Sequence, residues 1–417
     1  MKRLAIHGGN TVIEPDEARF IWPLINNDVR EAVLKQLDET ISIYDNSGIF
    51  GSFEQKYADD HNHKFGILFN SGTSAIMAMY FAINLKPGDK VLCPAYTFHA
   101  TVSPLMSTGA HPVFCDSDNQ GNISINSIKE KYTPDVKAIV VTHMWGVPIK
   151  NIEKIAEFCK EKNLVLLEDC SHAHGAKFNG KPIGSFGHIS AWSLQGQKII
   201  SGGEGGILAT SNDEYRNRAL LLGHYNKRPK KEISDSYDLK KYFLTGYGLK
   251  LRAHPVAIAI AAQQYESLEQ IINQKQIFAD KLIATLEQYS FFSVATQESS
   301  QFSWYALPIA YNQFEAANIS REKIVEALHE EGLVEYDIPG STGLINYLPL
   351  FNTPNELMPH LYPSRLENQG GFVNARQFQD TLIKLPVWAT SGDSSVVDKY
   401  IEGTKKVCDY IAKNGDL

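Results

Sequence analysis

The stretch LVLLEDCSHAHGA, residues 164–176, decides the fold class, because a short apolar run ends there in two carboxylates. A run that is apolar at every position, rather than at alternate positions, is typical of a strand covered on both faces. Helical patterns at residues 75–85 and 152–162 lie between further runs of this kind. The alternation predicts an α/β domain with a mostly parallel sheet. We expect its strands at Lys90–Cys93, Pro112–Cys115, Lys137–Thr142, Leu164–Leu167, Ile189–Ser193 and Gly206–Ala209.

The sequence changes character after about residue 255, where His254 and Pro255 precede a long helical stretch. Beyond it, residues 303–311 resemble a strand, and residues 321–331 and 395–413 have helical spacing. These patterns predict a smaller α+β domain. We therefore expect an N-terminal arm at 1–30, a large α/β domain at 31–254, a connecting helix at 255–289 and a small C-terminal domain at 290–417.

Two polar stretches, residues 225–241 and 339–371, are predicted to be loops. The first carries the basic run KRPKKE at 227–232, which is typical of a solvated surface and could alternatively bind phosphate. The second is long, and a long loop in a compact domain is more often functional than idle.

Composition limits the classes of function. The 417 residues include 40 Lys and Arg against 47 Asp and Glu, a net charge of −7, so no basic excess indicates a nucleic-acid or membrane partner. The five cysteines form no C-x-x-C motif, which argues against a zinc ribbon and a disulfide scaffold. Because no apolar run is long enough for a signal peptide or a membrane span, we expect a cytoplasmic protein.

A candidate phosphate site lies at residues 70–75, NSGTSA, which follow a strand-like run and open an apolar helix. Gly72 allows a tight turn, and Thr73 or Ser74 can cap the helix. The first amides of a helix are unpaired and carry partial positive charge, so they attract phosphate. An ordinary capped helix is the alternative, and no Walker motif follows.

Asp169 ends a buried strand and is followed by His172 and His174. These three side chains could ligate a metal, since histidine and carboxylate are common ligands. Alternatively, Asp169 could hold a protonated ring nitrogen of a cofactor, or simply cap a turn. The segment alone does not choose between these interpretations.

Lys198 lies between a strand and a glycine-rich loop, in the segment SLQGQKIISGGEGG at 193–206. A lysine that is sequestered from water loses its proton more easily, and a neutral amine is nucleophilic toward an aldehyde. A surface lysine beside a flexible turn is the alternative. Together, the phosphate site, the strand-end carboxylate and the lysine are the contacts that pyridoxal 5′-phosphate (PLP) needs.

Four strings in this order carry a resemblance that covers nearly the whole chain: SGTSA at 71–75, PAYTFHAT at 94–101, EDCSHAHGA at 168–176, and SLQGQK with GEGG at 193–206. The chain resembles the DegT/DnrJ/EryC1/StrS family of sugar aminotransferases. The resemblance implies a fold-type-I PLP enzyme with a mostly parallel seven-stranded sheet sandwiched by helices. It also implies a homodimer with shared active sites, and pyridoxamine 5′-phosphate as the form of the cofactor between two half-reactions.

The resemblance also implies roles for single residues. Lys198 looks like the lysine that bonds to the cofactor and moves protons, and Asp169 looks like the partner of its ring nitrogen. His172 looks like a catalytic residue near the ring and its phenolic oxygen. Further cofactor contacts are implied for the phosphate ligands Thr73, Ser74 and Ser193, for the backbone of Gly72, and for the stacking ring of Phe98.

One position departs from the family pattern. Many members carry an asparagine two residues before an arginine, and it reaches the phosphate in the partner subunit. Here Lys250 stands two residues before Arg252 and takes that place. A lysine could still meet the phosphate as a point charge, or it could face solvent.

The expected function is amino transfer from L-glutamate or L-glutamine to a keto sugar, most simply one linked to a nucleotide. A cyclitol ketone of the scyllo-inosose type is the alternative acceptor. A PLP-dependent sugar dehydratase is disfavoured, because histidine replaces the lysine in those relatives. Two other classes stay open: a metal hydrolase that uses Asp169, His172 and His174, and a regulator that binds the cofactor without catalysis.

Overall fold

The structure is a computed structural model that describes residues 3–14, 20–367 and 369–417. The expected N-terminal arm, residues 1–30, therefore lies partly outside the described residues. Within the described part of the chain, no helix combines the length and the apolar composition that crossing a bilayer requires.

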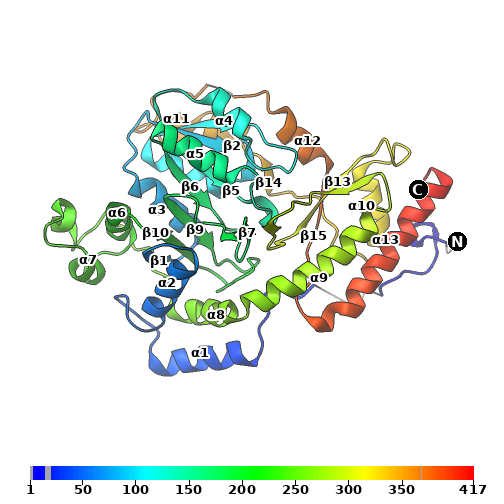
Figure 1. Cartoon of the computed structure of the whole chain (residues 1–417), viewed down its shortest axis with the longest axis horizontal. Coiled ribbons are helices and arrows are strands. Elements are labelled where there is room, and N and C mark those ends of the chain that lie inside the picture. The colour runs from blue at the N-terminus through cyan, green and yellow to red at the C-terminus, as the bar shows by residue number, and fades with distance from the viewer. Residues whose placement is uncertain (1–2, 15–19, 368) are drawn as a thin grey trace.

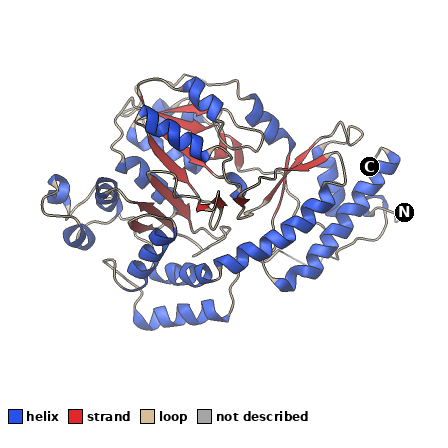
Figure 2. Cartoon of the chain, in the orientation of Figure 1, coloured by secondary structure: helices blue, strands red, loops and turns tan. Residues whose placement is uncertain are grey.

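A seven-stranded sheet forms the centre of the molecule (Figures 1 and 2). Its spatial order is β1-β10-β9-β6-β5-β2-β4, and β10 alone runs antiparallel to its neighbours, so the prediction of a mostly parallel sheet is confirmed. The strands are β1 (Phe65–Phe69), β2 (Lys90–Pro94), β4 (His111–Cys115), β5 (Val136–Thr142), β6 (Val165–Asp169), β9 (Ile189–Ser193) and β10 (Gly206–Thr210).

Helices cover both faces of this sheet, which explains why its strands are apolar throughout. On one face, α3 (Gly72–Ala82) and α6 (Asp213–Gly223) pack in a core that includes Leu167. On the other face, the core around Leu166 takes in α2 (Gly48–Asp60), α4 (Ile125–Lys131), α5 (Ile152–Lys162) and α8 (Pro255–Glu266). Helix α1 (Asn27–Glu39) packs on α8.

The C-terminal part has a smaller antiparallel sheet in the order β11-β13-β15, with helices against it. The predicted connecting helix is interrupted at Ser267, which ends α8 and begins α9 (Leu268–Leu286). The elements are β11 (Phe292–Val294), β13 (Leu307–Tyr311), β15 (Leu382–Leu385), α10 (Arg321–Glu330), α12 (Val373–Thr381) and α13 (Ser394–Asn414).

Short elements complete the chain. Two pairings of short strands connect distant segments: β14 with β3, and β12 with β7 and β8. The strands are β3 (Tyr96–Phe98), β7 (Lys177–Phe178), β8 (Lys181–Pro182), β12 (Ser300–Gln301) and β14 (Thr342–Leu344). The helices are α7 (Lys227–Glu232), α11 (Pro354–Leu357) and the 3₁₀ turns η1 (Ala5–His7), η2 (His99–Thr101), η3 (Ser103–Thr108), η4 (Met144–Gly146), η5 (Asp238–Tyr242), η6 (Pro349–Phe351) and η7 (Ser391–Asp393).

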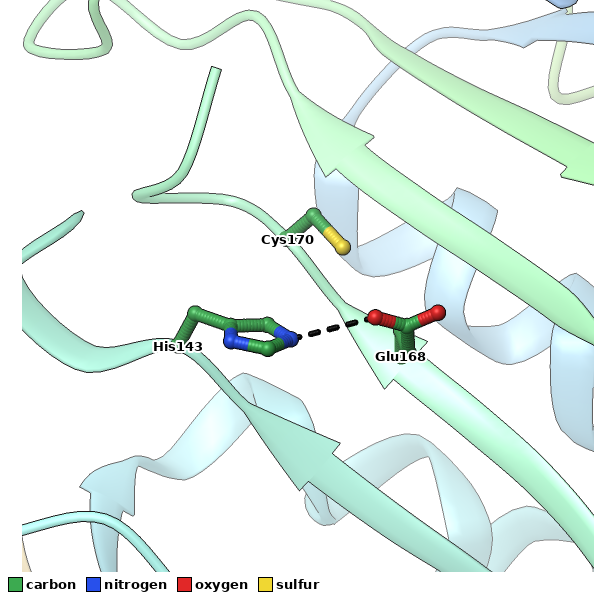
Figure 3. A group of neighbouring side chains, drawn as sticks. All are labelled: His143, Glu168 and Cys170. Carbon is green, nitrogen blue, oxygen red and sulfur yellow. Dashed lines mark hydrogen bonds and ion pairs between the residues drawn. The ribbon is translucent and has the colours of Figure 1, made fainter. Parts of the chain in front are cut away.

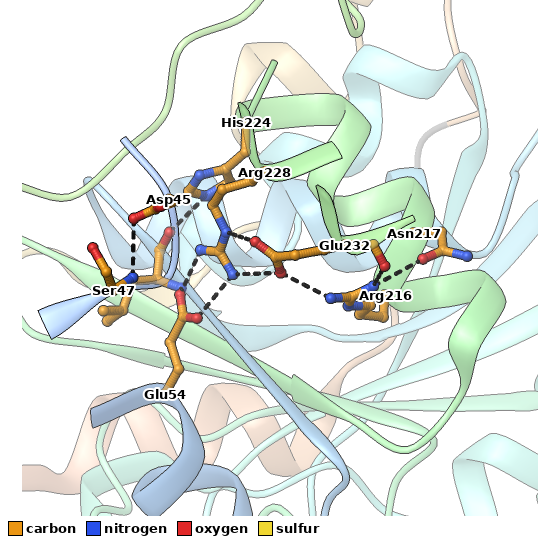
Figure 4. A network of polar contacts seen from close by, with 9 residues as sticks. Asp45, Ser47, Glu54, Arg216, Asn217, His224, Arg228 and Glu232 are labelled. Carbon is orange, nitrogen blue, oxygen red and sulfur yellow. Dashed lines mark hydrogen bonds and ion pairs between the residues drawn. The ribbon is translucent and has the colours of Figure 1, made fainter. Parts of the chain in front are cut away.

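Both predicted loops contain regular elements, so the prediction of plain loops is wrong in both places. Residues 225–241 hold α7, and residues 339–371 hold β14 and α11. The basic run KRPKKE is not simply a solvated surface, because Arg228 is buried. Its guanidinium donates to Glu54 at 2.7 and 2.8 Å and to Glu232 at 2.7 Å (Figure 4).

This buried network reaches the central sheet. Glu54 also accepts the backbone N–H of Leu68 at 2.8 Å, two residues before the NSGTSA segment. Glu232 is held in turn by Arg216 at 2.8 Å. The paired charges satisfy one another, as burial demands. The network thus fixes the strand that leads into the candidate phosphate site.

Candidate active site

A cavity of about 420 Å³ lies at the carboxyl ends of the parallel strands, where open α/β sheets bind ligands. Seven of the nine site residues predicted from the sequence line it: Gly72, Thr73, Phe98, Asp169, His172, Ser193 and Lys198. Two do not. Ser74 follows the lining residue Thr73 but is not itself part of the lining, and Lys250 is exposed and apart from the cavity of its own chain.

The phosphate site is the N-terminus of α3, beside the end of β9. Ser71 caps the helix by accepting the N–H of Ser74 at 3.1 Å. A Cβ on Gly72 would lie 2.5 Å from the Cβ of Ser193, so glycine lets the two segments meet. The Ser74 hydroxyl donates to Asn70 at 2.8 Å and is thus used within the turn. Free helix amides and two hydroxyls, on Thr73 and Ser193, remain beside the cavity.

Asp169 ends β6 with its side chain turned toward the cavity and almost fully buried. One carboxylate oxygen accepts the hydroxyl of Thr101 at 2.8 Å. The other accepts the N–H and the hydroxyl of Ser171 at 3.0 and 2.6 Å. These donors fix the orientation of the carboxylate, which suits a partner for a protonated ring nitrogen.

Lys198 lies in the turn after β9, and its amine enters the cavity near Asp169. Burial lowers the pKa of this amine to about 8, although the charge of Asp169 acts to raise it. The nitrogen lies 4.8 Å from the centre of the Tyr305 ring. The backbone is held by the indole N–H of Trp22, which donates to the Lys198 carbonyl at 2.8 Å. A fixed amine that loses its proton easily is suited to attack an aldehyde.

His172 stacks on Tyr305, with ring centres 3.9 Å apart and planes within 3° of parallel. Burial, with a contribution from the charge of Lys198, lowers the pKa of His172 well below its usual value. The ring is therefore neutral near pH 7. Because Nδ1 accepts the N–H of Trp145 at 3.3 Å, the ring proton is assigned to Nε2. His172 thus offers a hydrogen-bond donor.

His174 does not share the cavity. Its Nε2 contacts the Ser193 carbonyl at 2.8 Å, and its Nδ1 contacts the Tyr57 hydroxyl at 2.8 Å. The carbonyl can only accept, so Nε2 carries the proton and Nδ1 accepts from Tyr57. No lone pair of His174 is left for a metal, which argues against the predicted alternative of an Asp169, His172 and His174 metal site.

Among the described residues, one cluster could supply three metal ligands (Figure 3). Its members are His143, Glu168 and Cys170, whose possible ligand atoms all lie within 4.8 Å of one another. His143 Nδ1 accepts the N–H of Ile149, so Nε2 carries the proton that it donates to Glu168 at 3.1 Å. Glu168 also accepts three backbone amides, at Gly184, Phe186 and Gly187. Burial raises the pKa of the Cys170 thiol and keeps it protonated. The cluster is therefore internally satisfied.

Several lining residues were missed at the sequence level. Thr101 and Ser171 stood inside the strings PAYTFHAT and EDCSHAHGA, so their positions were visible but their contacts with Asp169 were not. Tyr305, Asp337 and Lys384 come from the C-terminal part of the chain and had no local signal. Their position at the cavity depends on how the C-terminal part of the chain packs against the part that holds the central sheet.

These features fit PLP. The close approach at Gly72 leaves the α3 amides open for a phosphate, Asp169 is a held carboxylate, and Lys198 is a readily deprotonated amine. One neutral ring, His172, and one exposed aromatic ring, Phe98, border the same space. The residues that would hold the cofactor are thus Gly72, Thr73, Ser193, Asp169 and Lys198.

Comparisons with known proteins agree with this geometry. The profile of the DegT/DnrJ/EryC1/StrS aminotransferase family matches residues 27–399. GDP-perosamine synthase of Escherichia coli O157:H7 is 32% identical over 62% of this chain and 68% of its own length. A putative L-glutamine:3-amino-2,3-dideoxy-scyllo-inosose aminotransferase of Streptoalloteichus tenebrarius is 25% identical over 97% of both chains.

The fold also matches solved structures. An aminotransferase from Psychrobacter cryohalolentis superposes with a TM-score of 0.82, covering 95% of this chain and 100% of that one at 23% identity. The likeness bears out the α/β fold with its mostly parallel central sheet.

Proposed function

This chain belongs to the DegT/DnrJ/EryC1/StrS aminotransferase family and is a PLP-dependent aminotransferase, and we propose that it moves an amino group from L-glutamate or L-glutamine to a nucleotide-linked keto sugar. The observation that carries the proposal is that Lys198 and Asp169 line one cavity beside the α3 N-terminus. A readily deprotonated amine, a held carboxylate and a phosphate site then serve one chemistry.

Each of the cavity residues has its own role in the proposed amino transfer. When bound, the cofactor supplies an electron sink for the electrons left behind when the substrate loses its α-proton. Asp169 holds a protonated ring nitrogen by accepting its hydrogen bond. The Lys198 amine would take the proton from the α-carbon of the substrate and deliver it to the former aldehyde carbon of the cofactor, across the nitrogen that joins the two. His172 would donate through Nε2 to an oxygen at the edge of the bound ring, and Phe98 would pack against a face of that ring.

The relatives' names support a sugar acceptor. One is a GDP-perosamine synthase, and another acts on dTDP-4-dehydro-2,3,6-trideoxy-D-glucose according to its name. A cyclitol acceptor is the second candidate, because the inosose aminotransferase matches almost the full length of both chains.

The acceptor is tested with the purified enzyme in its pyridoxamine form. Keto sugars linked to GDP, dTDP or UDP and scyllo-inosose are added singly, and the return of the aldehyde absorbance is followed. A response to nucleotide-linked keto sugars at micromolar concentrations supports the proposal. A response to scyllo-inosose alone would replace it with the cyclitol function.

A homodimer with shared sites is part of the proposal. Exposed apolar side chains support it: α1 presents Leu34 and Leu37, and the segment after η5 presents Leu244 and Tyr247. Lys250 follows that segment and would meet the phosphate in the partner's cavity. Mixing inactive Lys198→Ala and Lys250→Glu proteins should restore part of the activity, because one of the two sites in a mixed dimer is then intact. No recovery after subunit exchange would contradict shared sites.

We also place the protein in the cytoplasm. All five cysteines are buried and unpaired, as expected of a reducing compartment. Cell fractionation with an antibody against the chain tests this location.

A further inference from the structure

The cavity holds one cation whose charge is not used by the chemistry above. Among the described residues that line it, Lys198 and Lys384 carry ammonium groups, and Asp169, Glu204 and Asp337 carry carboxylates. Lys198 and Asp169 are committed to the cofactor. Lys384, which faces Asp337, is then the lining cation that a negatively charged part of a substrate could meet.

Lys384 is held at a fixed place on the cavity wall. It belongs to β15, and its backbone N–H and carbonyl bond to those of Asp337 at 2.8 and 2.9 Å. The two side chains also form an ion pair, with 2.9 Å between nitrogen and oxygen. The pair is partly exposed, 31% for the lysine and 54% for the aspartate, so a ligand can reach both groups.

The Lys384 ammonium also lies near the reacting centre. Its charge contributes to the lowered pKa of His172, whose ring stacks on Tyr305 close to the Lys198 amine. Ser341 and Thr342 line the same cavity, and Thr342 pairs with Phe98 where β14 meets β3. A group bound to Lys384 would thus lie in the cavity that Phe98 and His172 also line.

The two proposed substrates differ in the charge that they carry close to the reacting carbon. Any α-amino acid donor carries a carboxylate directly on its reacting carbon. A nucleotide-linked sugar carries its phosphates on a different carbon from the ketone, and the ring around that ketone is neutral. One site must therefore present a cation to the first substrate and tolerate a neutral ring in the second.

We propose that Lys384 binds the α-carboxylate of the amino donor, and that Asp337 pairs with Lys384 when the neutral acceptor ring occupies the site. This inference rests on the proposed aminotransferase function and names the residue that recognises the donor. The donor carboxylate and Asp337 compete for the ammonium group of Lys384. Lys384 can therefore exchange one carboxylate for the other without any movement of the backbone bridge between residues 337 and 384.

Binding of 2-methyl-L-glutamate to the PLP-loaded enzyme tests this directly, because this donor analogue has no α-proton to lose. Its Kd is read from the visible absorbance. Lys384→Met keeps the apolar stem and removes the charge, and the Kd should rise by about 10-fold or more, as expected for a lost charge-assisted hydrogen bond. Lys384→Arg should stay within a few-fold of the natural protein. A Kd for Lys384→Met within twofold of the natural value would overturn the proposal.

Lys323→Met is the matched control, because Lys323 is an exposed lysine on α10 that does not line the cavity. Its Kd should equal that of the natural protein. Asp337→Asn removes the competing carboxylate, so 2-methyl-L-glutamate should bind several-fold more tightly. If Asp337→Asn instead weakens binding as much as Lys384→Met does, Asp337 only holds the Lys384 side chain in position, and the proposed competition is wrong.

Half-reactions separate this inference from the identity of the acceptor. In the pyridoxamine form, Lys384→Met should lower kcat/KM for 2-oxoglutarate about 10-fold or more and leave kcat/KM for the keto acceptor nearly unchanged. An equal loss with the keto acceptor would show that Lys384 binds the phosphates, and would overturn the proposal. The 2-oxoglutarate and 2-methyl-L-glutamate results stand even if no keto sugar proves to be the acceptor.

Discussion

Glu168 and Asp169 are neighbours on β6, yet their side chains lie on opposite faces of the sheet and behave differently. Glu168 accepts from His143 and three backbone amides in a closed cluster. Although burial acts to raise it, the bond from His143 and those amides hold the pKa of Glu168 below its usual value. Asp169 accepts from Thr101 and Ser171 and borders a cavity.

This difference distinguishes a buried carboxylate that stabilises the fold from one that is available to bind a ligand. Both are buried, and both end the same strand. A carboxylate whose acceptor positions are filled by its own chain stabilises the fold. One that is oriented by its neighbours and still borders a cavity is available to a ligand. Substitutions on the two sides of β6 should therefore affect different quantities.

The largest effect should come from Lys198→Ala on the cavity side. Loss of the Lys198 amine should lower kcat by about 10³-fold or more, because nucleophile and proton carrier disappear together. Tm of the cofactor-free protein should not fall, because burying that amine opposes folding. Steady-state assays and calorimetry check both. Activity within tenfold of the natural protein would place the chemistry on another residue.

Asp169→Asn should come next. The amide cannot hold a ring nitrogen in its protonated form, so kcat should fall by about 10²- to 10³-fold while the cofactor still binds. Rates are measured at saturating PLP, and binding is measured by absorbance. A fully active variant would contradict the assignment of Asp169 as the ring partner.

Glu168→Gln, on the opposite face, should change stability instead of rate. Removing the charge beside His143 and the amides should lower the free energy of unfolding by about 2–4 kcal/mol. The kcat of the folded fraction should stay near the natural value. Urea denaturation and active-site titration check this, with Glu153→Gln as the partly exposed control, whose ion pair with Lys181 lies on the surface. A large loss of kcat without loss of stability would make Glu168 catalytic.

The smallest effect is a pH dependence of the cofactor-free protein. The Lys198 amine has a pKa of about 8 in the folded state against its ordinary 10.5, so between these values the unfolded chain holds more protons. Stability contributed by this group therefore rises with pH from about 8 to 10.5. Relative to the natural protein, Lys198→Met loses this contribution, so its free energy of unfolding should rise less, or fall more, between pH 8 and 10.5 in chemical denaturation. Equal slopes would contradict the lowered pKa of Lys198.

The sequence predicted what is local. Apolar runs gave the strands of the central sheet, and the motifs around Gly72, Asp169 and Lys198 lie where strands end. The predictions that failed concern features that depend on contacts between residues far apart in the sequence. Helix α7 forms because Arg228 is buried against Glu54, a residue far away in the sequence.

Contacts across the cavity could not be predicted for the same reason. Tyr305 stacks on His172 and Lys384 lines the same cavity, both from the C-terminal part of the chain, and no short motif records that packing. The interruption at Ser267 also escaped prediction, since the helical pattern continues through it.

The central claim is that the Lys198 amine carries the cofactor. Lys275 offers a demanding comparison, because burial lowers the pKa of its amine to about 7, yet that amine is bound to the carbonyls of Trp304 and Val387 outside the cavity. Borohydride reduction of the PLP-loaded protein, followed by peptide mass spectrometry, distinguishes the two. We predict a phosphopyridoxyl group on Lys198. Its attachment to Lys275 or to another lysine, or no attachment at all, would contradict the claim.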